Sequence, residues 1–534
     1  MLGLFLFLPL LSSHYVCGLP PSPIVDLGYS RYRGIRLPAG IDEYLGMRYA
    51  APPLGDLRFR SPRDPVSTPG VQDVAKASSI SADQVPNQNI TAKFAEDCLF
   101  INVFTPSNAT ADSKLPVWVH IQGGGYARND NGNFNGTKII QESGLDFIFV
   151  NFNYRVGAFG FLASEYIRDD GDLNVGLLDQ RKALEWVQKH IAKFGGNPDH
   201  VVIHGDSAGA GSIAHHMTAY GGRDDHLFVG AIYESPFWPT LRTVAEMEFQ
   251  FDRVVQDTGC ADSESSLSCL RKVDFAKLQA ANAASPFPGA DRKPLPLWYF
   301  LPVIDDDLIE DKLYTLFEQG RMLRVPLLVG DDTNEGSTFA ANASTTAEMS
   351  SFLKANYPNL RPQSLEKIHG EYPLMAHLSN HSAYFPSTSA AYGDATFTCP
   401  GDHITGSLAG QSLLQIWNYR YNVRAASLIS KGLGVPHIFE ISAIFGVGNA
   451  GESSVTSYTD VNKDIVPIVM DYWISFIKHL DPNPARNSKG PFWEPWGLGT
   501  EKRLKMQTNE TGMELVPLNL TDHCLMWKSL VAEM

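Results

Sequence analysis

The fold is decided by the stretch His200-Val-Val-Ile-His-Gly-Asp-Ser-Ala-Gly209. Its apolar residues 201–203 are typical of a buried strand, and residues 205–209 fit the pattern Gly-x-Ser-x-Gly. In that pattern a strand bends sharply into a helix, and the two glycines let the backbones approach each other closely. The bend exposes the hydroxyl of Ser207 at the carboxyl end of the sheet, where ligands bind in such folds. We therefore predict that Ser207 is a nucleophile. The alternative is an ordinary glycine-rich turn with a capping serine.

The segments around this stretch alternate between strand-like and helical patterns. Apolar runs typical of buried strands occupy residues 115–122, 147–154, 200–204, 228–233 and 325–329. Residues 178–194 have the apolar spacing of a helix and end at Gly195-Gly-Asn-Pro198. This alternation predicts an α/β protein with a large central, mostly parallel mixed sheet flanked by helices. Because the proline-rich residues 285–302 favour the wall of a pocket over a domain boundary, we expect residues 19–534 to form a single domain.

A glycine-rich loop provides candidate donors for the oxygen of a substrate. Gln122-Gly-Gly-Gly-Tyr126 directly follows a predicted strand. Glycines let backbone N–H groups approach a developing oxyanion without obstruction by a Cβ atom. We assign this role to the amides of Gly124, Gly125 and Ala208. A phosphate-binding loop is the alternative, but no Lys-Ser or Lys-Thr pair follows the glycines.

A serine nucleophile of this type requires an acid and a base later in the chain. The strand at residues 324–330 is followed by Asp331, Asp332 and Glu335, and we choose Glu335 although position alone does not separate the three. For the base we choose His437, because it stands in a Gly/Pro loop before an apolar run. The other downstream histidines are His369, His377, His381, His403, His479 and His523.

Two further carboxylates lie next to this predicted machinery. Asp206 precedes the serine, and Glu440 follows His437 by three residues. They either favour the imidazolium form of His437 through their negative charge or are buried structural groups. Phe237 and Trp238 could likewise line a pocket for the acyl group or belong to the core.

The composition and the ends of the chain indicate an extracellular protein. The chain has 43 Lys and Arg against 58 Asp and Glu, a net charge of −15, which excludes nucleic acid as a partner. Residues 1–18 read as a signal peptide, and no other apolar run is long enough for a membrane anchor. We expect glycosylation at Asn-x-Ser/Thr triplets, which occur at Asn89, Asn108, Asn135, Asn342, Asn380, Asn509 and Asn519. The cysteines allow a short loop between Cys260 and Cys269 and a tie between Cys399 and Cys524.

Together the motifs resemble the type-B carboxylesterase/cholinesterase family. The similarity includes Tyr49-Ala-Ala-Pro-Pro-Leu-Gly-Asp-Leu-Arg-Phe59, Glu96-Asp-Cys-Leu-Phe-Ile-Asn-Val103, Asn153-Tyr-Arg-Val-Gly157, Gly434-Val-Pro-His437 and Cys524-Leu-Met-Trp527. The resemblance implies the α/β-hydrolase fold and the triad Ser207, Glu335 and His437, and it selects Glu335 over the two aspartates. It also implies the bridges Cys260–Cys269 and Cys399–Cys524, with no metal and no cofactor.

The sequence departs from this family in the loop of residues 61–97. Cys98 matches a half-cystine of the family, but no partner cysteine lies in that loop. The loop also lacks the tryptophan that stacks on choline, and its polar composition does not suit an oil surface. We therefore expect a secreted serine carboxylesterase whose partners are soluble esters of small to medium size and water, with no obligate protein partner. The alternatives are a lipase on long-chain glycerides, a dedicated esterase for one secondary metabolite or toxin, and a non-catalytic adhesion protein.

Overall fold

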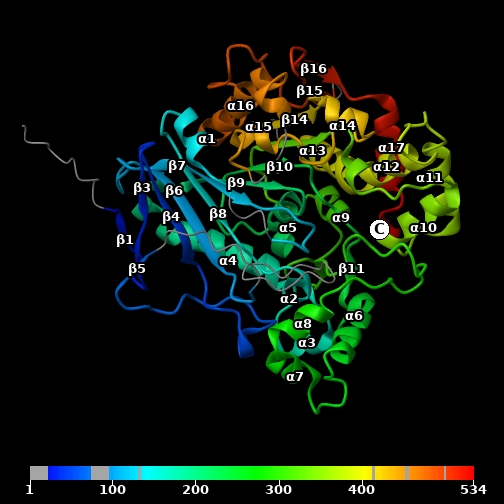
Figure 1. The fold of residues 1–534 in the computed structure, drawn as a ribbon, viewed down its shortest axis with the longest axis horizontal. Helices are drawn as coiled ribbons and strands as arrows, with labels where there is room; N and C mark the ends of the chain where they lie inside the picture. The colour runs from blue at the N-terminus through cyan, green and yellow to red at the C-terminus, as the bar shows by residue number, and fades with distance from the viewer. Residues whose placement is uncertain (1–21, 74–94, 130–133, 412–414, 451–455, 498–500) are drawn as a thin grey trace, which may run out of the picture.

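A large twisted β-sheet forms the centre of the molecule (Figure 1). The computed structural model describes residues 22–73, 95–129, 134–411, 415–450, 456–497 and 501–534. Within these residues eleven strands form one sheet in the order β16-β15-β14-β13-β10-β9-β7-β8-β6-β4-β3. Their bounds are β3 Ile35–Leu37, β4 Ile41–Arg48, β6 Phe100–Pro106, β7 Leu115–Ile121, β8 Ile148–Phe152, β9 Gly196–Asp206, β10 Gly230–Glu234, β13 Leu327–Asp332, β14 Ile416–Tyr421, β15 Lys502–Met506 and β16 Gly512–Leu515.

The middle of the sheet is parallel and its margins are antiparallel. Every pair from β8 through β7, β9, β10, β13 and β14 to β15 is parallel. The pairs β15–β16, β8–β6, β6–β4 and β4–β3 are antiparallel. The predicted α/β fold with a mostly parallel mixed sheet is therefore confirmed. Small sheets of β1 Ile24–Asp26, β2 Arg31–Arg33 and β5 Val71–Asp73, and of β11 Arg242–Thr243 and β12 Val303–Ile304, lie beside it.

Helices cover both faces of this sheet. On β7, Val117 and Val119 belong to one buried cluster, whereas Trp118 between them belongs to the other. This alternation follows from the period of two along a strand. Helices α4, α5 and α13 contact the first face, and α16 contacts the second. The helices are α1 Thr137–Glu142, α2 Gly157–Phe161, α3 Glu165–Asp170, α4 Val175–His190, α5 Ala208–Gly222, α6 Val244–Asp257, α7 Ser266–Lys272, α8 Phe275–Ala281, α9 Leu313–Glu318, α10 Thr346–Asn356, α11 Pro362–Glu371, α12 Phe385–Gly393, α13 Cys399–Gly410, α14 Ala426–Ser430, α15 Ile441–Phe445, α16 Val466–His479 and α17 Leu518–Lys528.

Some strand ends differ from the sequence-based expectation. The predicted strand at residues 324–330 is β13, which begins at Leu327 and continues through Asp332. Its last residues pair with β14, Asp331 with Arg420 and Asp332 with Tyr421. Asp331 and Asp332 thus belong to the strand itself, because a neighbouring strand supplies partners for their backbone groups. Similarly, β9 extends from Gly196 to Asp206 and ends immediately before Ser207.

Two disulfides connect helical segments around the sheet. Cys260 is bonded to Cys269 of α7, and Cys399 of α13 is bonded to Cys524 of α17. Cys98 is a buried free thiol, and burial raises its pKa well above the usual value of a cysteine. The predicted signal peptide and Asn89 lie outside the described residues. Of the other predicted glycosylation sites, Asn135 is half-buried, and Asn108, Asn342, Asn380, Asn509 and Asn519 are exposed.

Candidate active site

Ser207 occupies the sharp bend between β9 and α5. Its backbone has φ 54° and ψ −120°, a region that non-glycine residues rarely adopt. A Cβ atom on Gly209 would lie 1.9 Å from the carbonyl oxygen of Ile121, and one on Gly205 would lie 2.3 Å from the backbone carbon of Gly209. Both glycines are therefore required because three backbone segments meet at this bend.

The glycine-rich loop after β7 lies against the serine. A Cβ atom on Gly123 would lie 2.8 Å from the Cβ atom of Ser207, and the Gly123 amide donates to Asp206 Oδ1 at 3.0 Å. Gly124 and Gly125 have φ values of 112° and 62°, so both need the freedom of glycine. Within the described residues, the amides of Gly124, Gly125 and Ala208 donate to no acceptor of the protein. These amides are thus free to receive a hydrogen-bond acceptor from a ligand.

Glu335 and His437 contact each other although they are 102 residues apart. Glu335 Oε2 contacts Nδ1 of His437, and Glu335 Oε1 accepts hydrogen bonds from Ser235 Oγ and from the Asp332 amide, each at 2.7 Å. The glutamate is 2% exposed, so these donors replace the water that an ionised carboxylate would need. The contact at Nδ1 leaves Nε2 of His437 without a partner among the described residues.

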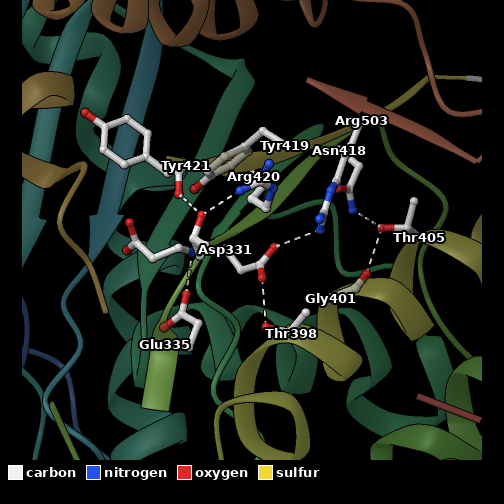
Figure 2. A network of polar contacts seen from close by, with 12 residues as sticks. Asp331, Glu335, Thr398, Gly401, Thr405, Asn418, Tyr419, Arg420, Tyr421 and Arg503 are labelled. Carbon is white, nitrogen blue, oxygen red and sulfur yellow. Dashed lines mark hydrogen bonds and ion pairs between the residues drawn. The ribbon is translucent and has the colours of Figure 1, made fainter. Parts of the chain in front are cut away.

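The other candidate acids point elsewhere. Figure 2 shows the carboxylate of Asp331 directed toward Thr398 and Arg503, away from that of Glu335. Thr398 Oγ1 donates to Asp331 Oδ2 at 2.7 Å, and Arg503 Nη1 lies 3.9 Å from Asp331 Oδ1. Burial raises the pKa of Asp331 to about 7 despite the nearby arginine. Asp332 Oδ2 accepts from the amide of Phe439 at 3.0 Å. Of the three carboxylates, only Glu335 contacts His437.

The loop that carries His437 is held by two residues that shortly precede Glu335 in the sequence. Asn334 Oδ1 accepts from the amide of Val435 at 2.9 Å, and the Asn334 amide donates to the carbonyl of Val435 at 2.9 Å. A Cβ atom on Gly434 would lie 2.0 Å from Asn334 Oδ1, so only glycine fits there. Because Asp332 also binds Phe439, the loop is fixed on both sides of His437.

The other downstream histidines have different environments. His369 bonds to Ser350, His377 to the carbonyl of His381, and His381 to the carbonyl of Lys431. His403 bonds to the carbonyl of Tyr314, and His523 to Asp394. His479 ends α16, and burial lowers its pKa. None of these contacts involves Glu335.

Aromatic rings surround the Glu335–His437 pair and the glycine-rich loop. The ring centroids of Phe397 and Phe339 lie 4.2 Å and 5.1 Å from that of His437. The indole of Trp298 lies so close to Gly125 that a Cβ atom there would be 2.1 Å from the ring, and Phe237 lies 5.6 Å from Trp298. Trp298 belongs to the proline-rich segment that sequence analysis predicted to be a pocket wall. Phe339 and Phe397 carried no signal in the sequence.

Phe237 and Trp238 have separate environments. Phe237 contacts Trp298 and Phe397, so it belongs to the aromatic group around the glycine-rich loop. Trp238 packs on Tyr314 and Phe317 and belongs to the core.

Several buried acids lie beneath these residues. Asp206 is 3.2 Å from Nε2 of His120, and Glu234 Oε2 is 2.9 Å from Nε2 of His204. Because Trp118 Nε1 donates to Nδ1 of His204, the proton of His204 is on Nε2 and is donated to Glu234. Burial raises the pKa of Glu234 well above its usual value. Glu234 ends β10 and has no motif around it, so nothing in the sequence marks it.

The described residues contain no group of three or more His, Cys, Asp or Glu side chains that could hold a metal ion. No helix in the described part of the chain is both long and apolar enough to cross a membrane.

Comparisons with known proteins agree on one family. The Carboxylesterase family matches residues 21–524 of the chain. Lipase 2 of Geotrichum candidum is 29% identical, over 91% of this chain and 89% of that protein. Secreted lipase 1 of Botryotinia fuckeliana is 30% identical, over 87% of this chain and 85% of that protein. The crystal structure of Aspergillus niger EstA is similar with a TM-score of 0.94 and 56% identity, covering 96% of this chain and 99% of that chain.

Proposed function

Because the chain belongs to the carboxylesterase family and is a serine hydrolase of ester bonds, we propose that it cleaves soluble esters of small to medium size through an acyl-enzyme on Ser207. The observation that supports this most directly is the buried contact of Glu335 with Nδ1 of His437, which leaves Nε2 free. A histidine oriented in this way is the usual base for a serine nucleophile.

In the proposed mechanism the oxygen of Ser207 attacks the carbonyl carbon of the ester while Nε2 of His437 accepts the hydroxyl proton. The tetrahedral intermediate then expels the alcohol, which takes that proton from His437. A water molecule, deprotonated in turn by His437, attacks the acyl-enzyme, and the acid is released as His437 returns this proton to the oxygen of Ser207. Glu335 remains ionised throughout and holds the imidazole in the tautomer with its proton on Nδ1.

The oxyanion of each intermediate would be bound by the amides of Gly124, Gly125 and Ala208. These amides have no acceptor within the described protein, and the adjacent Gly123 approaches Ser207 closely. Loss of one such donor costs about 2.7–4 kcal/mol of transition-state stabilisation.

The proposed substrate size is supported by the aromatic rings beside the glycine-rich loop. Trp298 lies against Gly125, and its ring centroid is 5.9 Å from that of Phe339. Phe397 lies against His437. Bulky rings at these positions limit the space for an acyl chain next to the reacting carbonyl. The polar loop segment at residues 79–91, whose composition also favours soluble esters, lies outside the described residues.

A lipase acting on long-chain glycerides is the second candidate, and the names of the two fungal relatives favour it. A rate series over p-nitrophenyl esters from two to sixteen carbons, with emulsified triolein alongside, separates the candidates. We expect maximal kcat/KM at short to medium chains and no increase at the oil surface. Strong activation by the emulsion would establish the lipase instead.

The role of Ser207 is tested by the variant S207A together with a fluorophosphonate probe. We expect a stoichiometric adduct on the wild-type protein, no adduct on S207A, and a fall in kcat of about 10⁴-fold or more. Ser212, a buried serine whose hydroxyl donates to the Ala208 carbonyl at 2.8 Å, provides the control variant S212A. Undiminished hydrolysis by folded S207A would refute the mechanism, and absence of any adduct would favour the non-catalytic alternative.

Secretion is part of the same proposal. Two disulfides and five exposed glycosylation triplets support passage through the secretory pathway, as does the relative named a secreted lipase. We expect protein recovered from the culture medium to begin near residue 19 by N-terminal sequencing and to lose mass on treatment with an N-glycosidase. Recovery of the full-length chain inside cells would contradict this.

A further inference from the structure

Two carboxyl side chains meet beneath the loop of His437. Asp332 is the last residue of β13 and Glu440 immediately precedes α15, and they are 1% and 0% exposed. Neither has a role in the mechanism above. Because a buried carboxylate without compensating partners is costly, their contacts require an explanation.

Each of the two carboxyl groups has one oxygen satisfied by the protein. Asp332 Oδ2 accepts from the amide of Phe439 at 3.0 Å, and Glu440 Oε1 accepts from the hydroxyl of Tyr419 at 2.9 Å. The other oxygens, Asp332 Oδ1 and Glu440 Oε2, receive no N–H or O–H from any other described residue. The two carboxyl groups interact with each other instead, and this interaction raises the pKa of Asp332 and opposes the rise that burial causes in the pKa of Glu440. Two buried carboxyl groups attract each other in this way only if one of them carries a proton.

The surroundings make double ionisation of the pair unfavourable. Burial and the negative charges of Glu440 and Glu335 raise the pKa of Asp332 well above its usual value. The titratable groups that face the pair come from every adjacent element: Glu234 on β10, Glu335 after β13, Tyr419 and Tyr421 on β14, and Tyr458. None of these groups can supply a positive charge to a second carboxylate. His437, on the adjacent loop, contacts Glu335 instead.

We propose that Asp332 and Glu440 share one proton and form a positioning pair that fixes the His437 loop against Glu335. The proton is on Asp332, which donates it to Glu440. The same residue donates its backbone N–H to Glu335 Oε1 and accepts from Phe439, two residues after His437. Asp332 therefore links the acid to the loop of the base, and Glu440 carries the single negative charge of the pair.

This inference rests on the proposed function, since the pair acts through His437. A neutral carboxylic acid that accepts with one oxygen and donates with the other is closely mimicked by an amide. We therefore expect D332N to restore the function that D332A loses. D332A should lower kcat about 10- to 100-fold with a change in KM below about threefold, whereas D332N should remain within about threefold of wild type. D331N is the control, because Asp331 lies on the same strand and contacts Thr398 and Arg503 instead of the loop.

The charge of the pair is tested by the pH dependence of kcat/KM. In D332N the charge stays on Glu440, and in E440Q it moves to Asp332, which then accepts from the glutamine amide. Each single variant therefore keeps one negative charge near His437, and only the double variant D332N/E440Q loses it. A lost negative charge destabilises the protonated imidazole, so the double variant should shift the acid limb of the kcat/KM profile to lower pH by about 0.5 unit or more, and each single variant by less than about 0.2 unit.

Each result supports or refutes the proposal. A shift in either single variant would mean that both groups are ionised, and an unshifted double variant would mean that the pair carries no charge. Full activity of D332A would show that the pair does not position the loop. If D332A fails to fold, the pH profiles of the amide variants still show whether the pair carries a single negative charge. Loss of activity in S207A separates the two proposals, because that result does not depend on Asp332.

Discussion

The two sides of the candidate site are built in different ways. The serine side is made of backbone: Gly205, Gly209 and Gly123 allow β9, α5 and the loop after β7 to come within contact of one another. The histidine side is made of polar side chains, in which Asn334 and Asp332 bind the two ends of the His437 loop. The first side tolerates no added atom, whereas the second depends on hydrogen bonds that can be removed singly. The difference shows that close packing fixes the position of Ser207 and that a polar network fixes the position of His437.

The largest effect is expected on the polar side from E335Q. The amide offers Nε2–H toward Nδ1 of His437 and no longer stabilises an imidazolium, so the wrong tautomer is favoured. We expect kcat to fall about 10³- to 10⁴-fold with little change in melting temperature. E366Q on the exposed face of α11 is the control. Retention of more than a tenth of the activity would remove Glu335 from the mechanism.

The backbone side is challenged by G209A. The new Cβ atom would lie 1.9 Å from the carbonyl oxygen of Ile121, and neither backbone can withdraw without breaking the sheet. We expect destabilisation of about 3 kcal/mol or more, measured by denaturant unfolding. In the matched variant G406A, within α13, no atom lies within 4 Å of the new Cβ. G406A should stabilise by about 0.5–1 kcal/mol, because alanine favours a helix over glycine. Equal stability of the two variants would contradict the packing argument.

The Asn334 clamp gives a smaller and more specific effect. N334A removes the acceptor of the Val435 amide, whereas N334D keeps an oxygen at the same place. We expect N334A to lower kcat about tenfold through misplacement of His437, and N334D to lower it less. Steady-state kinetics on one short ester measures both. If N334D were the more damaging variant, charge and not hydrogen bonding would control the loop.

The smallest effect is expected from D331N, which lies behind the site. Burial raises the pKa of Asp331 from its ordinary value of 3.8 to about 7 in the folded protein, so the folded state binds the proton more tightly. Stability contributed by this protonation is present below about pH 4 and is lost as pH rises through about 7. D331N should therefore gain melting temperature relative to wild type between pH 5 and pH 8. A difference between the two proteins that does not change with pH would contradict the raised pKa.

Much of the fold and of the candidate site could be predicted because the signals are local. The bend at Ser207 is visible as a pattern of five consecutive residues, although Gly209 in that pattern is required by the carbonyl of Ile121 on β7. The alternation of apolar strands and helices likewise predicted the parallel sheet that the structure contains. The predicted ends of β13 were wrong. This strand begins at Leu327, and pairing with β14 extends it through Asp332.

The tertiary structure alone decided which distant side chains meet. By position alone, Asp331, Asp332 and Glu335 are equivalent carboxylates after a run of apolar residues, and only the resemblance to the family favoured Glu335. In the folded protein the path of the chain turns Glu335 toward His437. Glu234, Phe339 and Phe397 had no motif at all, because a buried ring or acid acquires its neighbours from other parts of the chain. By itself the sequence determined the bend at Ser207, the glycine-rich loop and the class of fold, since each is marked by a pattern of residues close in the chain. The surroundings of His437 come from Phe397, Phe339 and Glu335, which lie 40, 98 and 102 residues earlier in the chain, and these contacts exist only in the folded protein.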